Sequence, residues 1–159
     1  MRREYEAPTE PADVPLVPPS VSLPEITPKA VILSVLLAAV LAGANAYLGL
    51  FAGMTVSASI PAAVVSMAVL RLFRQSNILE NNIVQTAASS GEALAAGVIF
   101  TIPGLVLIGY WTSFDYWHTV TVSLVGGVLA VLFTIPLRRA LIVHARLSFP
   151  EGVATAEVI

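Results

Sequence analysis

A short polar stripe stands out within the apolar residues 80–109. On an α-helix, where successive residues turn by about 100°, one narrow face would carry four polar side chains followed by two alanines. These residues are Asn82, Gln85, Ser89 and Glu92, then Ala93 and Ala96. Acidic residues inside a membrane face protein or water rather than lipid, and they commonly mark proton or substrate pathways. The stripe therefore predicts a helix with one hydrated side, and Glu92 is the candidate for coupling to protons.

The composition places this helix in a membrane. The 159-residue chain is 57% hydrophobic and 11% charged, whereas a soluble domain has about a quarter charged residues. Four apolar runs approach the roughly 17–25 residues that cross a bilayer as a helix. The strands of a membrane β-barrel would be shorter, and apolar and polar residues would alternate along them. The sequence thus predicts an all-α polytopic membrane protein with four transmembrane helices and the start of a fifth. The predicted spans are 28–51, 56–73, 82–111 and 119–137, with the fifth beginning at 149–159.

The basic residues predict how these helices are oriented. All eight lie before the first span or in its first turn, at the end of the second span or in the loop after it, or after the fourth span. Because cytoplasmic loops are enriched in Lys and Arg, the N-terminus, the second loop and the C-terminal end are predicted to be cytoplasmic, in a plasma (inner) membrane. Four aromatic residues then gather at the outer ends of the third and fourth spans, as an interfacial belt does. They are Tyr110, Trp111, Tyr116 and Trp117.

The first 26 residues have a different composition, with six prolines and five acidic residues. Such a segment has too few apolar groups to form a core, so residues 1–26 are predicted to be a disordered cytoplasmic tail. Thr27 and Pro28 then provide an N-cap and a first-turn proline for the first helix.

Two interpretations remain open for the junction between the first two spans. Small residues four positions apart predict close helix packing; the pairs are Ala39 with Gly43 and Gly49 with Gly53. Alternatively, Pro61 frees a backbone carbonyl, and hydroxyl groups nearby could satisfy it, which predicts a broken or kinked helix lining a cavity. Those hydroxyls belong to Thr55, Ser57 and Ser59. Discontinuous helices of this kind form substrate and ion sites in secondary transporters.

The third span is too long for a bilayer. About 30 residues at 1.5 Å each make about 45 Å, against about 30 Å of hydrocarbon. The helix must tilt, project into the cytoplasm, or break near Gly91 or Pro103. If it runs straight, Glu92 lies near the inner boundary, where water makes a charge tolerable. In the alternative, Glu92 lines a cytoplasm-facing vestibule with Gln85 and Ser89.

No catalytic or metal-binding pattern accompanies the stripe. The chain has no cysteine, and His118 and His144 are isolated from other ligands, so no metal site and no cofactor are predicted. The H-E-x-x-H, P-loop and G-x-S-x-G patterns do not occur, so the protein is not predicted to be an enzyme. No nucleic-acid partner is predicted either.

The last residues suggest a longer protein, and four stretches of sequence carry a resemblance to a known family. Residues 149–159 begin a helix that has no room to finish, which suggests a piece of a longer protein. The chain also resembles the N-terminal region of the oligopeptide transporter (OPT) superfamily. The stretches that carry the resemblance are NAYLGLFAGMTVSASIPAAVVSM, ILENNIVQTAASSGEALAAGVIFTIPGLVLIG, IPLRR and FPEGVATAEV.

The resemblance implies that residues 27–159 form the N-terminal part of a transmembrane transporter domain. Such a protein is a secondary transporter that imports small oligopeptides or metal–chelate complexes with protons; its yellow stripe-like branch handles chelated metals. The substrate-binding or proton-coupling candidates are Glu92, Gln85, Ser89, Asn82, Asn45, Ser57 and Ser59. The lipid bilayer is the other expected partner, and a homo-oligomer of the full-length protein is left open. The alternative function is a stand-alone four-helix membrane protein acting as an oligomeric channel or assembly subunit.

Overall fold

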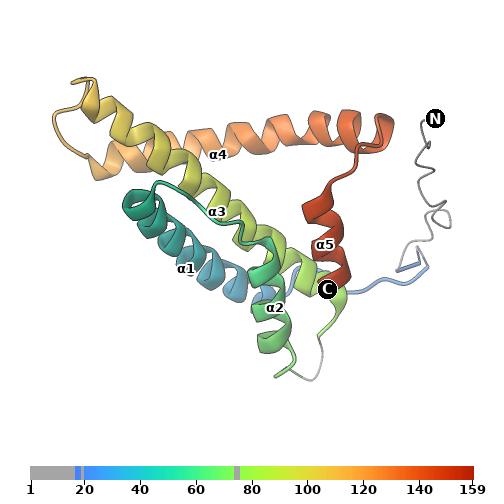
Figure 1. The fold of residues 1–159 in the computed structure, drawn as a ribbon. Coiled ribbons are helices and arrows are strands. Elements are labelled where there is room, and N and C mark those ends of the chain that lie inside the picture. Colours follow the sequence, from blue (N-terminus) through green and yellow to red (C-terminus); the bar gives the residue numbers. More distant parts are fainter. Residues whose placement is uncertain (1–16, 19, 74–75) are drawn as a thin grey trace, which may run out of the picture.

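The computed structural model describes residues 17–18, 20–73 and 76–159, and the regular elements in these ranges are all helical. Most of the predicted disordered tail, residues 1–26, lies outside the described residues. The elements are α1 (Pro28–Ala52), α2 (Ser59–Leu70), α3 (Ile78–Leu107), α4 (Tyr116–Arg138), a π-helical turn η1 (Arg139–His144) and α5 (Pro150–Val158). Figure 1 shows α1 and α3 side by side, with α4 crossing beyond them and α5 turning back toward α2.

The pairing of α1 with α3 organises the fold. The contacts follow the same order along both helices: Lys29 lies beside Glu80, Ala38 beside Gly91, and Gly49 beside Ile99. The two helices are therefore parallel, and the chain between them must return to the end from which α1 began. A small core at that end joins α1, α2 and α3; it consists of Ala30, Leu70 and Val84, with Leu33 and Leu37 packed against it.

Both paired helices begin with side-chain caps. The predicted cap of α1 is confirmed, since Thr27 Oγ1 accepts a hydrogen bond from the backbone N–H of Ala30 at 3.3 Å. At the start of α3, Asn77 Oδ1 accepts from the N–H of Glu80 at 2.9 Å, and Glu80 accepts from the N–H of Asn77 at 3.3 Å. This capping box starts α3 four residues before the predicted span. The helix then continues for 30 residues without a break at Gly91 or Pro103.

The second predicted span differs from the structure. In place of a helix over residues 56–73, residues 54–58 are non-helical and α2 has 12 residues, about 18 Å, which is too short to cross a bilayer alone. Gly53, at φ 68°, ends α1 in the left-handed conformation that glycine tolerates best. Pro61 is the third residue of α2, where the backbone amide has no partner within the helix in any case.

Three helices in the described ranges are long and apolar enough to cross a membrane. They are Pro28–Ala52, Ile78–Leu107 and Tyr116–His144, the last of which joins α4 to η1. The fourth span was predicted over residues 119–137, and the helix continues beyond it through Arg138 and Arg139 to His144. These apolar helices indicate an integral membrane protein, and α4 has no buried residue. The predicted aromatic residues gather at the turn between α3 and α4, where the Tyr116 and Trp117 rings lie 5.3 Å apart.

The small residues of α1 do not all pack as predicted. Ala39 and Gly43 are exposed, and a Cβ added at Gly43 would meet no atom within 4 Å, so the prediction of a contact at this pair is wrong. Ala38, rather than Ala39, lies on the face of α1 that contacts α3. Gly49 does pack closely, because a Cβ there would lie 2.2 Å from Ile99 Cδ1.

The tightest approach of the two helices is at Gly91, which leads to a prediction. A Cβ at Gly91 would lie 2.9 Å from Ala38 Cβ and 3.4 Å from Ala38 Cα, so G91A must push α1 away. We expect the free energy of unfolding to fall by about 1–3 kcal/mol, measured by denaturant titration of the full-length protein in detergent. In G97A the new methyl group meets no atom within 4 Å, so this control should be neutral or slightly stabilising. Equal effects of the two changes would rule out the close contact.

Candidate functional site

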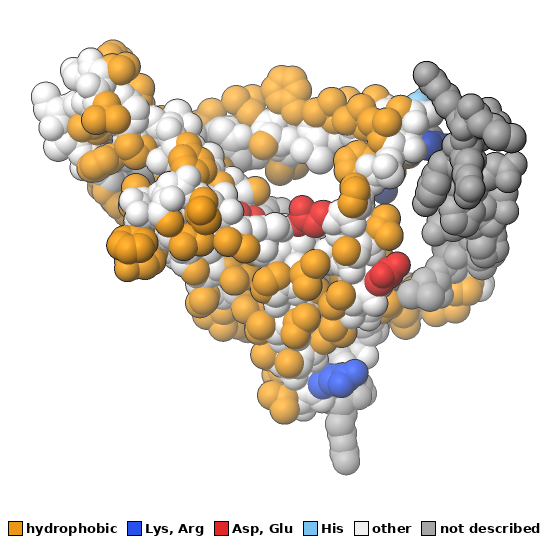
Figure 2. Space-filling model, in the orientation of Figure 1, with side chains coloured by type: hydrophobic (Ala, Val, Ile, Leu, Met, Phe, Trp, Pro, Cys, Tyr) orange, Lys and Arg blue, Asp and Glu red, His pale blue; other side chains and the backbone are white. Residues whose placement is uncertain are grey.

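A polar cleft lies between α3, the non-helical segment 54–58 with the start of α2, and α5 with the end of η1. Its volume is ≈ 1020 Å³. All six residues of the polar stripe line it along one face of α3: Asn82, Gln85, Ser89, Glu92, Ala93 and Ala96. Figure 2 shows the molecule hollowed between α4, α5 and the remaining helices, with acidic side-chain atoms inside the hollow.

Glu92 lies at the middle of α3 and at the edge of the non-helical segment. It is the fifteenth of the 30 residues of the helix and is 8% exposed. The backbone N–H of Ala58 donates to its carboxylate, and the Glu151 carboxylate is close enough to repel it. A buried carboxylate therefore faces a backbone donor on one side and a second acidic group on the other.

Two serines bring the start of α2 into the same cleft. The hydroxyl oxygens of Ser59 and Ser89 lie 3.0 Å apart, and this hydrogen bond joins α2 to α3. Ser57 Oγ donates to the Glu151 carboxylate, which joins the non-helical segment to α5. Six of the seven predicted site residues therefore line one cleft: Glu92, Gln85, Ser89, Asn82, Ser57 and Ser59.

The contribution of α5 to the cleft was not predicted from the sequence. Glu151 and Thr155 line the cleft from this helix. They are four residues apart and so share one helical face, which is a signal that the sequence carries. Glu151 is 94 residues from Ser57, however, and nothing local in the sequence indicates that contact.

Asn45, the seventh predicted residue, lies outside the cleft lining. It is 5% exposed on α1, and both ends of its side-chain amide bind the backbone of Val56. Nδ2 donates to the Val56 carbonyl at 2.8 Å, and Oδ1 accepts from the Val56 N–H at 3.0 Å.

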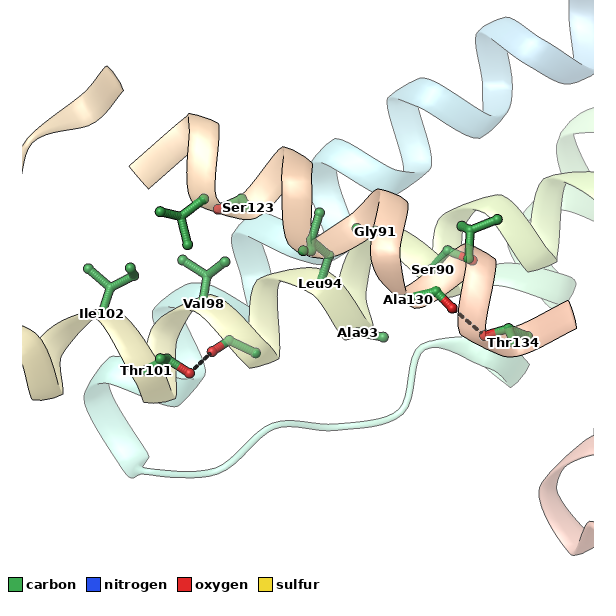
Figure 3. Close-up of a pocket in the computed structure, with 15 residues that line it drawn as sticks. Ser90, Gly91, Ala93, Leu94, Val98, Thr101, Ile102, Ser123, Ala130 and Thr134 are labelled. Atoms are coloured by element: carbon green, nitrogen blue, oxygen red, sulfur yellow. Dashed lines mark hydrogen bonds between the residues drawn. The ribbon is translucent and has the colours of Figure 1, made fainter. Parts of the chain in front are cut away.

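A second cavity, of ≈ 740 Å³ between α3 and α4, has a different character (Figure 3). Its walls are mostly small or apolar, and its hydroxyl groups bond to their own helices. Thr101 Oγ1 donates to the Gly97 carbonyl at 2.7 Å, and Thr134 Oγ1 donates to the Ala130 carbonyl at 2.8 Å. These hydroxyls are already satisfied, so the cleft beside Glu92 is the better candidate for a polar ligand.

The two histidines lie away from the cleft. His118 Nδ1 is 3.2 Å from Asp115 Oδ1, and its ring packs edge-on to Trp111. Hydrogen bonds from the backbone and side chain of His118 hold the pKa of Asp115 below its usual value. His144 ends η1. Among the described residues, no three His, Cys, Asp or Glu side chains are grouped so that they could hold a metal ion.

Comparison with known proteins identifies the family. The family model described as OPT oligopeptide transporter protein matches residues 25–159. This chain belongs to the OPT family. It is also 58% identical over 102 residues to a Haemophilus influenzae protein that is provisionally named an oligopeptide transporter. The matched stretch is 64% of this chain but 16% of that OPT relative, and no solved structure matches the chain.

Proposed function

We propose that the full-length protein is a secondary transporter that imports small oligopeptides or metal–chelate complexes together with protons. Membership of the OPT family supports transport. The observation that carries the proposal is the cleft itself, in which a buried glutamate, two amides and several hydroxyls line one polar space between apolar helices. A polar cargo can leave water only where such groups replace its hydration.

We infer that the chain crosses the membrane four times, with a discontinuous second crossing. Because α1 and α3 are parallel, residues 53–77 return from the far end of α1 to the start of α3. Five non-helical residues extend at most about 17 Å, and α2 adds about 18 Å, which together match a hydrocarbon core of about 30 Å. Non-helical backbone at membrane depth is tolerated where it is buried in protein or lines a water-filled cavity.

The position of Glu92 supports a role in proton coupling. Gly91 packs against Ala38, which is ten residues along α1 from Pro28, or about 15 Å. This is half the thickness of the hydrocarbon core, so Glu92 lies nearer the middle of the bilayer than the inner boundary considered from the sequence. A carboxylate at that depth favours a proton carrier over a solvated charge.

The charges of the cleft indicate which part of a cargo it takes. Glu92 and Glu151 both line it, and its described lining contains no Lys, Arg or His side chain. A positively charged group is therefore favoured, such as the ammonium of a peptide N-terminus or the cation of a chelate. The negatively charged end of the same cargo must find its partners elsewhere in the full-length protein.

Uptake by the full-length protein in proteoliposomes tests this function. Labelled di- to tetrapeptides and labelled iron chelates are supplied with and without an inward proton gradient. We expect accumulation of one of these classes that collapses when a protonophore removes the gradient. Accumulation that ignores the gradient would contradict proton coupling, and no uptake of either class would contradict the proposed cargo.

The four-crossing topology gives a separate prediction. Ser76 and Ser113 are exposed, and the 159 residues contain no cysteine. In cells and inverted vesicles, a cysteine at Ser76 should react with a membrane-impermeant maleimide only from the cytoplasmic side. A cysteine at Ser113 should react only from outside. Reversed sides would contradict the predicted orientation, and the same side for both would show that α3 does not cross the membrane.

A further inference from the structure

The hydrogen bonds of Asn45 suggest a role other than binding cargo. Its side-chain amide uses its donor and its acceptor on a single residue, Val56. The residue is 5% exposed on α1, and the cleft is lined by Thr55 and Ser57, the neighbours of Val56, but not by Val56 or Asn45. Asn45 is thus bonded to the backbone and does not line the cleft.

The need for such a partner follows from the chemistry of the backbone. Residues 54–58 are non-helical, so their N–H and C=O groups lack the bonds that a helix would provide. In apolar surroundings an unpaired backbone group costs several kcal/mol. An asparagine amide carries both N–H donors and a carbonyl acceptor, so it can pair with the C=O and the N–H of one residue as a neighbouring strand would.

The opposite side of the same segment makes the bonds that form the cleft. Ser57 bonds to Glu151 of α5, and the N–H of Ala58 donates to Glu92 of α3. One residue further on, Ser59 bonds to Ser89. These groups lie at the cleft, so a cargo could replace their present hydrogen-bond partners. The two bonds from Asn45 instead fix Val56, which does not line the cleft.

Space for this arrangement comes from Gly49, one turn after Asn45 on α1. A Cβ at Gly49 would lie 2.2 Å from Ile99 Cδ1 and 3.7 Å from Thr55 Cγ2. The missing side chain lets α1 approach α3 and the non-helical segment together. Asn45 and Gly49 therefore act on the same stretch of backbone.

We infer that Asn45 is a positioning residue, which clamps the backbone at Val56 so that Ser57 and Ser59 face the cleft, and that it is not itself a ligand of the cargo. This inference rests on the proposed function only where it treats the cleft as the cargo site. The clamp itself is a statement about the backbone and can be tested without transport.

The test places a cysteine at Ser57 in the full-length protein, in a background where any cysteine outside these residues is replaced by serine. The rate of its reaction with a small impermeant maleimide is then compared between N45L, N45D and the native residue. N45D keeps the shape and the acceptor but loses the donor to Val56, so it remains informative if N45L fails to insert. S34A is the matched control, because Ser34 is also buried on α1 but its hydroxyl has no hydrogen-bond partner.

We expect the labelling rate to rise several-fold in N45L and N45D, because the released segment moves, and to stay at the native rate in S34A. In proteins that retain Ser57, the half-saturating cargo concentration should rise by up to about tenfold, with little change in the maximal rate per inserted protein. Native labelling rates in both Asn45 variants would overturn the clamp, whatever their uptake. Raised labelling in a protein that transports neither class of cargo would leave the clamp standing and contradict the proposed function instead.

Discussion

Replacing Glu92 with glutamine is expected to reduce gradient-driven uptake by the full-length protein to the level of protein-free vesicles. Glutamine keeps the size of the side chain and accepts a hydrogen bond from the Ala58 N–H, so the cleft should retain its shape. It cannot bind and release a proton between pH 4 and 10. If Glu92 carries the coupled proton, E92Q therefore removes the driving force without removing the binding site.

Exchange measurements separate these two effects. Vesicles are loaded with unlabelled cargo and placed in a solution of labelled cargo. The exchange of one for the other needs no net proton movement, so E92Q should still catalyse it. Loss of both exchange and driven uptake would indicate that Glu92 binds cargo rather than couples protons. Retained uptake with the native pH dependence would remove Glu92 from the mechanism altogether.

A matched control is available on α5. Glu157 is exposed and does not line the cleft, so E157Q removes the same charge from a neighbouring helix without entering the site. Its uptake and pH dependence should match those of the native protein. A loss in E157Q equal to that in E92Q would point to a general effect of charge on insertion or stability.

The parts of this site that the sequence predicted are those set by local periodicity. The stripe from Asn82 to Ala96 follows from 3.6 residues per turn, and the structure keeps it on one face because α3 is unbroken. The start of α3 carried a local signal too. Asn77 and Glu80 have the spacing of a capping box, which places the first helical residue at Ile78.

The break in the helix before α2 was not predicted in detail, because residues 54–58 are nearly as apolar as a membrane-spanning helix. What competes with the helix is a pair of hydrogen bonds from Asn45, eleven residues away, and a glycine at 53 that turns the chain. The sequence admitted a broken helix but could not supply these partners. The position of Glu151 beside Ser57 depends on how α4, η1 and α5 return the chain, which no local pattern encodes.

The largest effect on stability is expected from Glu80, where α3 is fastened to the start of α1. Its side chain is fully buried and accepts hydrogen bonds from Thr27 Oγ1 at 2.5 Å and from the Asn77 N–H at 3.3 Å. Lys29 Nζ lies 3.0 Å from Oε2 and 5.9 Å from the centre of the Phe73 ring. The carboxylate thus joins the starts of α1 and α3, and Lys29 adds a contact with Phe73 after α2.

Removing this carboxylate takes away the acceptor of the Thr27 hydroxyl and of the Asn77 N–H. We expect E80A to lower the free energy of unfolding of the full-length protein in detergent by about 2–4 kcal/mol. This is below the most that a broken buried pair costs, because the Lys29 side chain is 23% exposed and can turn to water. E25A is the control, since Glu25 lies two residues before Thr27 and is exposed, and it should change stability little.

The double variant K29M/E80L distinguishes an ion pair from a packing contact. Replacing both charges with apolar side chains removes the Lys29 ammonium together with the carboxylate that it faces, so it should recover part of the stability lost in E80A. If the double variant is as unstable as E80A or worse, the hydrogen bonds to Thr27 and Asn77 rather than the ion pair fasten the two helices. Uptake should follow stability in both variants, because Glu80 lies about 18 Å along α3 from Glu92 and does not line the cleft.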